Sequence, residues 1–369
     1  METPSRPLPP GATIGILGNG QLGRMLALAA ARLGYRTHVF GPDKDSPAEQ
    51  VATRSTVAAY EDVGALVGFA ASVDAVTFEF ENVPVQSAKE LAARLPVRPA
   101  PAILEIAQDR IKEKQFFASI KAATPSWSII NNYNELNDSV KALGTPSVLK
   151  TARLGYDGKG QAKIRSLDDT ESAWATVTGG RAPKEDGFAV LEAFVDFRCE
   201  ISVIVARSAD GTTMTFEPAE NDHANHILAT STVPARVDAA TIDSAVQIAT
   251  KAAEALSLVG LLAVEMFVTS SGQVLCNEMA PRPHNSGHWT MDAGGVDQFG
   301  QLVRAVAGLP LLTPTRYADV TMINLIGDDV NDIDRYLRDP RARVHLYGKR
   351  DARPGRKMGH VNLLQPRRN

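Results

Sequence analysis

Two glutamates, Glu265 and Glu278, stand in the segment VEMFVTSSGQVLCNEM, where their carboxylates could bind a divalent cation. Apolar and β-branched residues flank Ser271-Gly272, which predicts two strands joined by a two-residue turn. That turn pairs Glu265 with Glu278 and Val268 with Leu275. Carboxylates placed opposite each other repel unless a cation bridges them, and oxygen ligands suit Mg²⁺. The alternative is a register slip that leaves one glutamate in solvent.

Polar side chains are dense in two segments toward the C-terminus. The segment MAPRPHNSGHWT follows Glu278 directly and contains Arg282, His284, Asn285 and His288. Such density at the exit of an acidic strand favours a binding or catalytic site. The segment YGKRDARPGRKMGHVN carries Lys349 and Arg356 among glycines, which suggests a phosphate-binding turn. The alternative for this basic run is an ordinary solvated surface.

A glycine-rich loop, TARLGYDGKGQ, follows an apolar strand that ends at Lys150. Gly155, Gly158 and Gly160 would let the backbone approach a polyphosphate, while Lys150 and Lys159 supply positive charge. The loop lacks the spacing and the Lys-Ser/Thr ending of a P-loop. A flexible hairpin tip is the alternative interpretation.

The segment LEAFVDFRCEISVIV could contact a nucleoside. In an edge strand beside a cleft, the backbone of residues 193–195 could hydrogen-bond an adenine edge, and a carboxylate such as Glu200 could bind ribose hydroxyls. A turn at Asp210-Gly211 places Glu200 opposite Asn221, close to His223. A histidine in such a place is also often a hydrogen-bonded structural residue.

The N-terminal sequence ILGNGQLGRM matches G-x-G-x-x-G through Gly18, Gly20 and Gly23, after a predicted strand and before a predicted helix. The helix N-terminus could receive a phosphate or a carboxylate. A nicotinamide dinucleotide also requires an acid at the end of the second strand, and Asp43 comes only after a proline turn. A nucleotide-like substrate is therefore an equal alternative. The third strand runs into Glu79, Glu81 and Asn82, at the edge where α/β sheets bind ligands.

The elements that position these residues alternate along the chain. Strand and helix alternate over the first hundred residues, which predicts a parallel sheet, and residues 108–122 read as a helix. Residues 145–195 predict a small α+β module, and two hairpins follow, separated by a helix over 239–256. Another helix is predicted over 299–307. We divide the chain into a disordered tail (1–11), a Rossmann-like domain (12–112), a linker and lid (113–193) and a C-terminal domain (194–369).

Composition excludes several classes of protein. The 39 basic and 42 acidic residues nearly cancel, which argues against a protein that mainly neutralises nucleic acid. The two cysteines read as core residues of a reducing cytoplasm rather than as a disulfide. The N-terminus lacks an apolar signal segment, and no run of apolar residues is long enough for a membrane span. We therefore expect a cytoplasmic enzyme without nucleic-acid or membrane partners.

Taken in order, several of these motifs resemble one enzyme family. Arg110, Lys150, the glycine-rich loop, EAFV with Glu200 and the paired glutamates are similar to the ATP-grasp superfamily. Within it, GNGQLGRM, FEFENV, GYDGKGQ, NEMAPRPHNSGHWT and GRKMGHVN resemble the 5-(carboxyamino)imidazole ribonucleotide synthases of purine biosynthesis. The resemblance covers residues 13–362. It implies an ATP-grasp fold with a Rossmann-like N-terminal domain, a small α+β lid and a C-terminal mixed β domain.

The same resemblance implies a reaction. ATP and bicarbonate would carboxylate 5-aminoimidazole ribonucleotide through carboxyphosphate, releasing ADP and phosphate. It implies Mg²⁺, with two ions expected, held by Glu265 and Glu278, and a homodimer. The residues that it assigns to ATP are Arg110, Lys150, Gly155, Gly158, Lys159, Gly160, Gln161, Glu192, Ala193, Phe194, Val195, Glu200, His223, Asn277 and Glu278.

The resemblance also assigns residues to the site of the second substrate. The residues matching that site are Gly20, Gln21, Leu22, Glu79, Asn82, Tyr156, Asp157, Arg282, His284, Asn285, Lys349 and Arg356, of which Tyr156, Asp157, His284 and Lys349 are assigned to catalysis. Lys349 and Arg356 could hold a 5′-phosphate, and Asp157 could steer or deprotonate the amine. The alternatives are another ATP-grasp ligase, such as a formate-dependent glycinamide ribonucleotide transformylase, a nicotinamide-dependent oxidoreductase, and a non-catalytic nucleotide-binding subunit.

Overall fold

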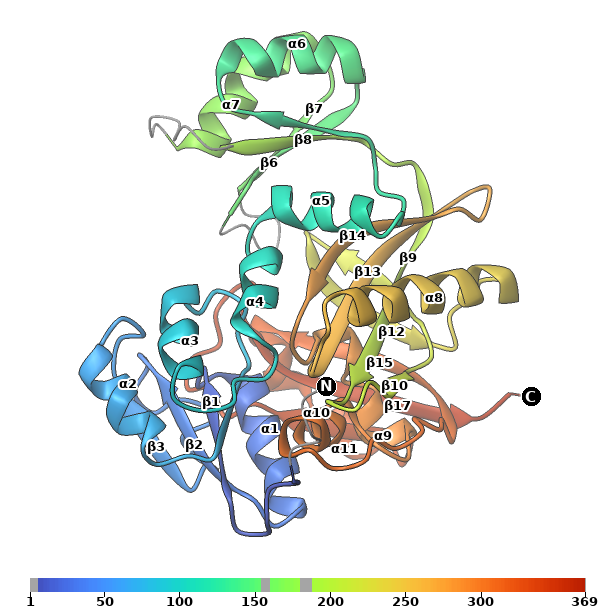
Figure 1. Cartoon of the computed structure of the whole chain (residues 1–369). Helices are drawn as coiled ribbons and strands as arrows, with labels where there is room; N and C mark the ends of the chain where they lie inside the picture. The colour runs from blue at the N-terminus through green and yellow to red at the C-terminus, as the bar shows by residue number, and fades with distance from the viewer. Residues whose placement is uncertain (1–5, 154–159, 180–187, 369) are drawn as a thin grey trace.

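The structure, a computed structural model, describes residues 6–153, 160–179 and 188–368, and its strands form three sheets (Figure 1). The first sheet is parallel, as the alternating pattern predicts, with the order β3-β2-β1-β4. Its strands are β1 (Thr13–Leu17), β2 (Arg36–Gly41), β3 (Arg54–Val57) and β4 (Ala75–Phe78). The sequence did not reveal β3, because this edge strand is short and mostly exposed and lacks an apolar run.

Four helices accompany the first sheet: α1 (Gln21–Arg32), α2 (Val63–Ala70), α3 (Val85–Ala92) and α4 (Pro101–Ala107). Helix α5 (Arg110–Ser119) follows within the stretch predicted to be helical. Asp109 caps this helix, because its side chain accepts hydrogen bonds from the backbone N–H groups of Ile111 and Lys112 at 3.0 and 3.3 Å. Figure 1 shows α5 between the first sheet and the elements above it.

The second sheet is antiparallel, with the order β5-β8-β6-β7, and carries two helices, α6 (Tyr133–Leu143) and α7 (Thr170–Thr178). Its strands are β5 (Trp127–Ile130), β6 (Ser147–Thr151), β7 (Gln161–Ile164) and β8 (Ala189–Ala193). These elements, called the lid below, enclose their own apolar core around Ile130, Leu149 and Leu191. They stand at the top of the molecule in Figure 1.

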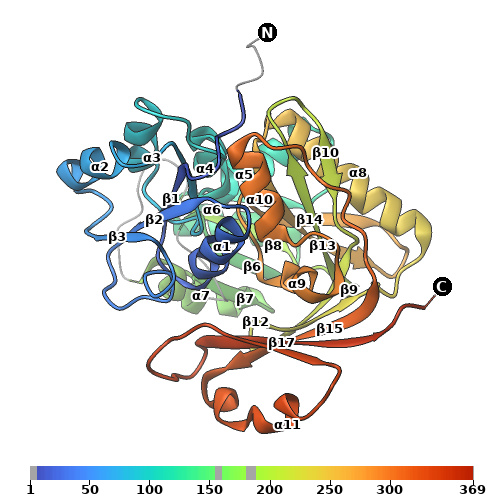
Figure 2. The ribbon, with the colours of Figure 1, turned by 90° about the horizontal axis from the view of Figure 1, so that it is seen from below.

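The third sheet holds the rest of the strands and is largely antiparallel, in the order β14-β13-β9-β11-β12-β15-β17-β16, with β10 on β9. The long strands β12, β15 and β17 lie together beside α11 in the view from below (Figure 2). Its strands are β9 (Phe197–Arg207), β10 (Thr213–Thr215), β11 (Ala219–Ala224), β12 (Ile227–Val233), β13 (Gly260–Thr269), β14 (Val274–Ala280), β15 (Ala318–Ile326), β16 (Ala342–Leu346) and β17 (Lys357–Pro366). Its helices are α8 (Ala239–Ala255), α9 (Thr290–Ala293), α10 (Gln298–Ala307) and α11 (Asp334–Leu337).

The hairpin between β13 and β14 pairs Glu265 with Glu278, as predicted, but its turn was predicted wrongly. Thr269 and Gln273 close a three-residue loop ending at Gly272, whose φ is +83°. The longer loop shifts the register, so that Val268 faces Val274 rather than Leu275. A bulge then shifts the register back between Met266 and Glu265.

The hairpin near Asp210-Gly211 also has a longer loop than predicted and a later shift of register that compensates for it. Ser208 and Thr212 close a three-residue loop, and Thr213 faces Arg207. The register changes by one residue before β11, so that Asn221 faces Glu200 as predicted. Both predictions near the cavity hold because each loop insertion is followed by a compensating irregularity, which turn chemistry cannot reveal.

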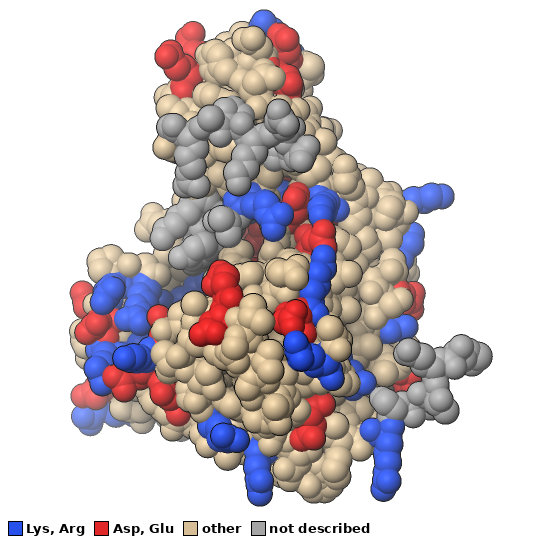
Figure 3. Space-filling model, turned by 60° about the vertical axis from the view of Figure 1, so that its left-hand side comes forward, with Lys and Arg blue, Asp and Glu red and all other residues tan. Residues whose placement is uncertain are grey.

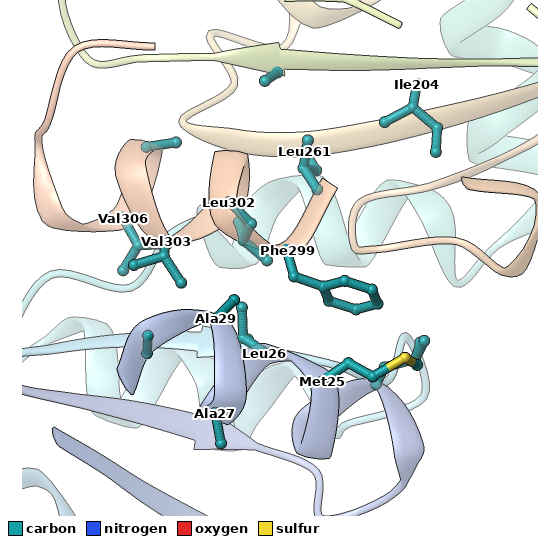
Figure 4. Close-up of a cluster of buried hydrophobic side chains, with 14 of the residues drawn as sticks. Met25, Leu26, Ala27, Ala29, Ile204, Leu261, Phe299, Leu302, Val303 and Val306 are labelled. Carbon is teal, nitrogen blue, oxygen red and sulfur yellow. The ribbon is translucent and has the colours of Figure 1, made fainter. Parts of the chain in front are cut away.

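The first and third sheets share a continuous apolar core where α1 packs on α10 (Figure 4). Met25, Leu26 and Ala29 of α1 face Phe299 and Leu302 of α10. Two hydrogen bonds to backbone carbonyls extend the contact: Leu8 N donates to Ala307 O at 2.8 Å, and the Arg98 guanidinium donates to Val306 O at 2.7 Å. Within the described residues, no helix combines the length and apolar character that crossing a bilayer requires.

Candidate active site

A cavity of about 980 Å³ lies where the three sheets meet. Basic and acidic side chains gather on the face just below the lid (Figure 3). The cavity is lined by Gly20, Gln21, Leu22, Glu79, Asn82, Arg110, Lys150, Gln161, Glu192, Ala193, Phe194, Val195, Glu200, His223, Glu265, Asn277, Glu278, Arg282, His284, Asn285, Lys349 and Arg356, among others. Residues predicted to bind ATP and residues predicted to bind the second substrate thus share one enclosure.

Six predicted residues need separate mention. Gly160 does not line the cavity; its φ of +71° shapes the end of the β6–β7 hairpin, and a Cβ there would lie 2.7 Å from the Thr151 hydroxyl. The other five lie outside the described residues: Gly155, Tyr156, Asp157, Gly158 and Lys159. Their predicted roles in binding phosphates and steering the amine stay predictions.

The bulge in β14 determines which side chains reach the cavity. In a regular strand, neighbouring residues point to opposite faces of the sheet. Asn277 is the extra residue of the bulge, and both Asn277 and Glu278 line the cavity. The Asn277 Oδ1 atom is buried and has no hydrogen-bond partner among the described residues. An amide oxygen beside two carboxylates is a suitable donor set for a hard cation such as Mg²⁺.

Each of the paired carboxylates has a different basic side chain as its partner. Glu265 Oε1 lies 2.9 Å from His284 Nε2, and Glu278 Oε2 lies 3.2 Å from Arg110. Burial raises the pKa of Glu265, but the charges of His284 and His223 outweigh burial and hold that pKa below its usual range. Among the described residues, the ligand atoms of Glu200, His223 and Glu265 come within 4.8 Å of one another, so Glu265 is close to the residues expected at the ribose.

Lys150 reaches the cavity from the lid strand β6, and Glu192 holds it there. Glu192 Oε2 lies 2.9 Å from Lys150 Nζ, and Glu192 Oε1 lies 3.3 Å from Lys114 Nζ. Burial raises the pKa of Glu192, yet the two ammonium groups outweigh this and keep the pKa below its usual range. The Glu192 carboxylate therefore orients Lys150 rather than facing an adenine ring.

The segment after β8, which was predicted to contact adenine, lines the cavity. The backbone N–H groups of Ala193 and Phe194 already donate to Ser126 O and Pro146 O at 2.8 and 3.1 Å, so other backbone groups must contact an adenine edge. Phe194 is exposed, and the Lys163 ammonium lies 3.7 Å from the centre of its ring. Across the cavity, Glu200 Oε2 lies 3.3 Å from His223 Nδ1, as the predicted proximity requires.

The glycine motif of the first sheet binds a carboxylate of the protein itself. Glu79 accepts hydrogen bonds from the backbone N–H groups of Gly20 and Gly23 at 2.6 and 2.9 Å, at the N-terminus of α1. A Cβ on Gly18 would lie 2.4 Å from Glu79 Cγ. The glycines thus allow Glu79 to approach, and the position that a dinucleotide pyrophosphate would need is occupied. This arrangement speaks against the nicotinamide alternative.

The remaining wall carries the residues predicted for the second substrate. Arg282 forms an ion pair with Glu81 of the segment after β4, and Asn285 exchanges two amide hydrogen bonds with Asn324 at 2.8 and 3.0 Å. Lys349 donates to the Lys357 carbonyl at 2.7 Å, and burial and neighbouring cations lower its pKa to about 8. Two anchored cations, Arg282 and Lys349, therefore face a cavity also lined by Glu79.

Sequence reasoning missed two buried residues that contact the β14 hairpin, Glu113 and Lys114. Both lie on α5, and both are almost fully buried. A signal was present: residues three and four positions after Arg110 share its helix face, so a helix that brings Arg110 to the cavity brings Glu113 and Lys114 with it.

Comparison with known proteins adds three family matches. Residues 115–299 match the ATP-grasp domain, and residues 11–108 match the ribonucleotide synthetase preATP-grasp domain. Residues 320–369 match the phosphoribosylaminoimidazole carboxylase C-terminal domain. The N5-carboxyaminoimidazole ribonucleotide synthase of Brucella melitensis is 50% identical over 360 residues, covering 98% of each chain. That of Bacillus subtilis is 43% identical, covering 96% of this chain and 92% of its own.

Solved structures of the same family of enzymes also match this chain. A crystal structure of an N5-carboxyaminoimidazole ribonucleotide synthetase with ADP is 42% identical, with a TM-score of 0.93 over 98% of this chain and 94% of that one. The Aspergillus clavatus enzyme, solved with ADP and 5-aminoimidazole ribonucleotide, is 29% identical, with a TM-score of 0.89 over 97% of this chain and 94% of that one. The fold predicted from the motifs is confirmed, and the chain belongs to the N5-carboxyaminoimidazole ribonucleotide synthase family of ATP-grasp enzymes.

Proposed function

We propose that this chain is an ATP-dependent carbon–nitrogen ligase that carboxylates 5-aminoimidazole ribonucleotide with bicarbonate in purine biosynthesis. One observation carries the proposal. A single cavity is lined both by the lid and hairpin residues expected around ATP, such as Lys150 and Glu278, and by Glu79, Arg282 and Lys349, expected around the second substrate. Relatives named for this activity cover nearly the whole chain.

The proposed chemistry proceeds in two stages. A bicarbonate oxygen attacks the γ-phosphorus of ATP, the bond to ADP breaks, and carboxyphosphate forms. Carboxyphosphate then splits into phosphate and carbon dioxide, and the amine of the ribonucleotide bonds to the carbon and loses a proton. Water would hydrolyse carboxyphosphate, so enclosure of the cavity by the lid protects it.

The chain's own residues bind and orient the reactants in this scheme. Arg110 and Lys150 offset the charge of the ATP phosphates, and their partners Glu278 and Glu192 fix where the two cations point. Arg282 and His284 line the cavity, paired with Glu81 and Glu265, and suit bicarbonate or carboxyphosphate. Lys349 and Arg356 hold the 5′-phosphate, and Asp157 is proposed as the group that receives the amine proton.

Mg²⁺ fits the hairpin, because Glu265, Glu278 and Asn277 Oδ1, which has no partner among the described residues, offer oxygen donors on one wall. The ion, with a second one expected, would neutralise charge on the phosphates. We further propose the domain boundaries predicted from the sequence, a cytoplasmic location and a homodimer.

ADP release in the presence of each acceptor tests the function. We expect ADP formation that requires bicarbonate and 5-aminoimidazole ribonucleotide together, with the carboxylated product detected by mass spectrometry. Glycinamide ribonucleotide with formate is the matched control acceptor, and activity with that pair instead would transfer the chain to the other ligase class. Glu278→Gln should abolish turnover, and full activity of that variant would refute the metal assignment.

A further inference from the structure

The backbone on each side of Glu278 is held by two adjacent side chains of α5. Lys114 Nζ donates to the Asn277 carbonyl at 3.2 Å, and the Met279 N–H donates to Glu113 Oε1 at 2.6 Å. Strand β14 lies at the end of its sheet, so these outward backbone groups cannot pair with another strand. Two side chains from α5 therefore fix the strand immediately before and after the predicted metal ligand.

Helix geometry makes this possible. Arg110, Glu113 and Lys114 lie three and four positions apart, so they project from one face of α5. The first of the three holds the Glu278 side chain, and the other two hold its flanking backbone. One helix face thus holds the side chain of Glu278 and the backbone on both sides of it.

Lys114 also connects the hairpin to the lid. Its side chain is 0% exposed, and its ammonium lies 3.3 Å from Glu192 Oε1 of β8. The other oxygen of Glu192 holds Lys150 at 2.9 Å. A buried ammonium is costly unless it is paired, so moving either partner disturbs the other.

We infer that Glu113 and Lys114 are positioning residues that fix the β14 bulge, and with it the direction of Asn277 and Glu278, in register with Lys150 of the lid. The inference rests on the proposed function, since it assigns the hairpin to Mg²⁺ and ATP. We assign both residues a role through their contacts with strand β14 and not through contact with a substrate.

The experiment is the Mg²⁺ dependence of ADP formation by Lys114→Met, which keeps the side-chain volume and removes the ammonium. Removing a group that supports metal ligands weakens metal affinity by about 10-fold to 100-fold. We therefore expect the half-saturating Mg²⁺ concentration to rise by roughly that factor, with a lower kcat and an unchanged KM for the ribonucleotide. Lys112→Met, on the exposed side of the same helix, is the matched control and should behave as wild type.

Glu113 provides a rescue test. Glu113→Gln retains an oxygen that accepts from the Met279 N–H, whereas Glu113→Leu cannot. We expect Glu113→Leu to show the raised Mg²⁺ requirement and Glu113→Gln to restore most of the wild-type response. A purely structural role would lower thermal stability in both Glu113→Leu and Lys114→Met without changing the Mg²⁺ response of the folded enzyme.

A wild-type Mg²⁺ response in folded Lys114→Met and Glu113→Leu overturns the inference. If Lys114→Met does not fold, Lys114→Gln, which can still donate to one oxygen, takes its place and should show an intermediate shift; an unshifted response there also overturns it. Mg²⁺-dependent binding of ADP can be measured by thermal shift in the absence of the acceptor substrate. It separates failure of this inference from failure of the proposed function, because wild-type turnover alone tests the latter.

Discussion

At the scale of single residues, the Lys349 ammonium is expected to lose its proton in mildly alkaline solution. Burial is the main reason that its pKa falls to about 8, and the charges of Arg356 and Lys357 lower it further, while Glu79 opposes them. A phosphate binds the protonated ammonium, so affinity should fall as pH rises through about 8. We predict that the KM for 5-aminoimidazole ribonucleotide increases between pH 7 and pH 9 and that Lys349→Met removes this dependence. Initial rates in buffers of constant ionic strength measure it; parallel pH profiles for both proteins would contradict the assignment.

Glu113 gives a second pH prediction, on stability. Burial, followed by the charge of Glu278, raises its pKa from 4.5 to about 8. Between these values the folded state keeps a proton that the unfolded state loses, so this group lowers stability as pH rises through the interval. Glu113→Gln cannot ionise. Its melting temperature relative to wild type should therefore increase from pH 5 to pH 8, as measured by circular dichroism, and a constant difference would refute the shifted pKa.

Much of the lining of the cavity could be predicted from the sequence, for reasons that differ between residues. Glu265 and Glu278 were paired correctly because the bulge cancels the error in the predicted turn. Glu113 and Lys114 were missed because charged residues in a helix usually face solvent, and only tertiary packing buries them here.

At the scale of elements, the glycine motif before α1 shows how strongly one side chain constrains a loop. Gly18 has φ of +107°, and a Cβ there would displace Glu79 from the helix N-terminus. We predict that Gly18→Ala lowers stability and raises the KM for the ribonucleotide. Gly34→Ala is the control, because Gly34 also has positive φ (+78°) but nothing within 4 Å of a Cβ, so it should cost only about 1–2 kcal/mol of backbone strain. Urea unfolding and steady-state kinetics provide both readouts, and equal behaviour of the two variants would contradict the role of Glu79.

Elements with a strong periodic pattern of apolar residues could be predicted. A short exposed strand, and loops whose extra residue is offset by a bulge, could not. Helices α8 and α10 begin and end within about two residues of their predicted limits. Strand β3 and the exact loop lengths escaped, because an exposed edge strand and a bulge leave little trace in residue type. Among the lid strands, the apolar run that ends at Lys150 predicted β6, whereas β5 and β7 were not predicted.

At the scale of the whole molecule, α1 and α10 join the first sheet to the third through a shared core. Leu26 and Leu302 are almost fully buried in it. Leu26→Ala and Leu302→Ala should each lower the free energy of unfolding by about 2–5 kcal/mol. Leu28→Ala is the matched control on α1, since Leu28 is 47% exposed. Urea denaturation measures all three, and a loss for Leu28→Ala equal to that for Leu26→Ala would contradict the packing.

The sequence predicted the order of the three regions but not how they meet. Alternating strands and helices indicate a parallel sheet, yet nothing in the residues of α1 identifies α10 as its partner, because both helices are simply amphipathic. The domain boundaries proposed from the sequence likewise remain a prediction.

The position of α5 along β14 has a consequence for the behaviour of the protein in concentrated solution. An uncovered end strand offers unpaired backbone groups to other chains and can start aggregation. The side chains of Glu113 and Lys114 and the carbonyl of Ala123 occupy three such groups. The contacts that hold the backbone of β14 therefore also protect the sheet from strand exchange with neighbouring molecules.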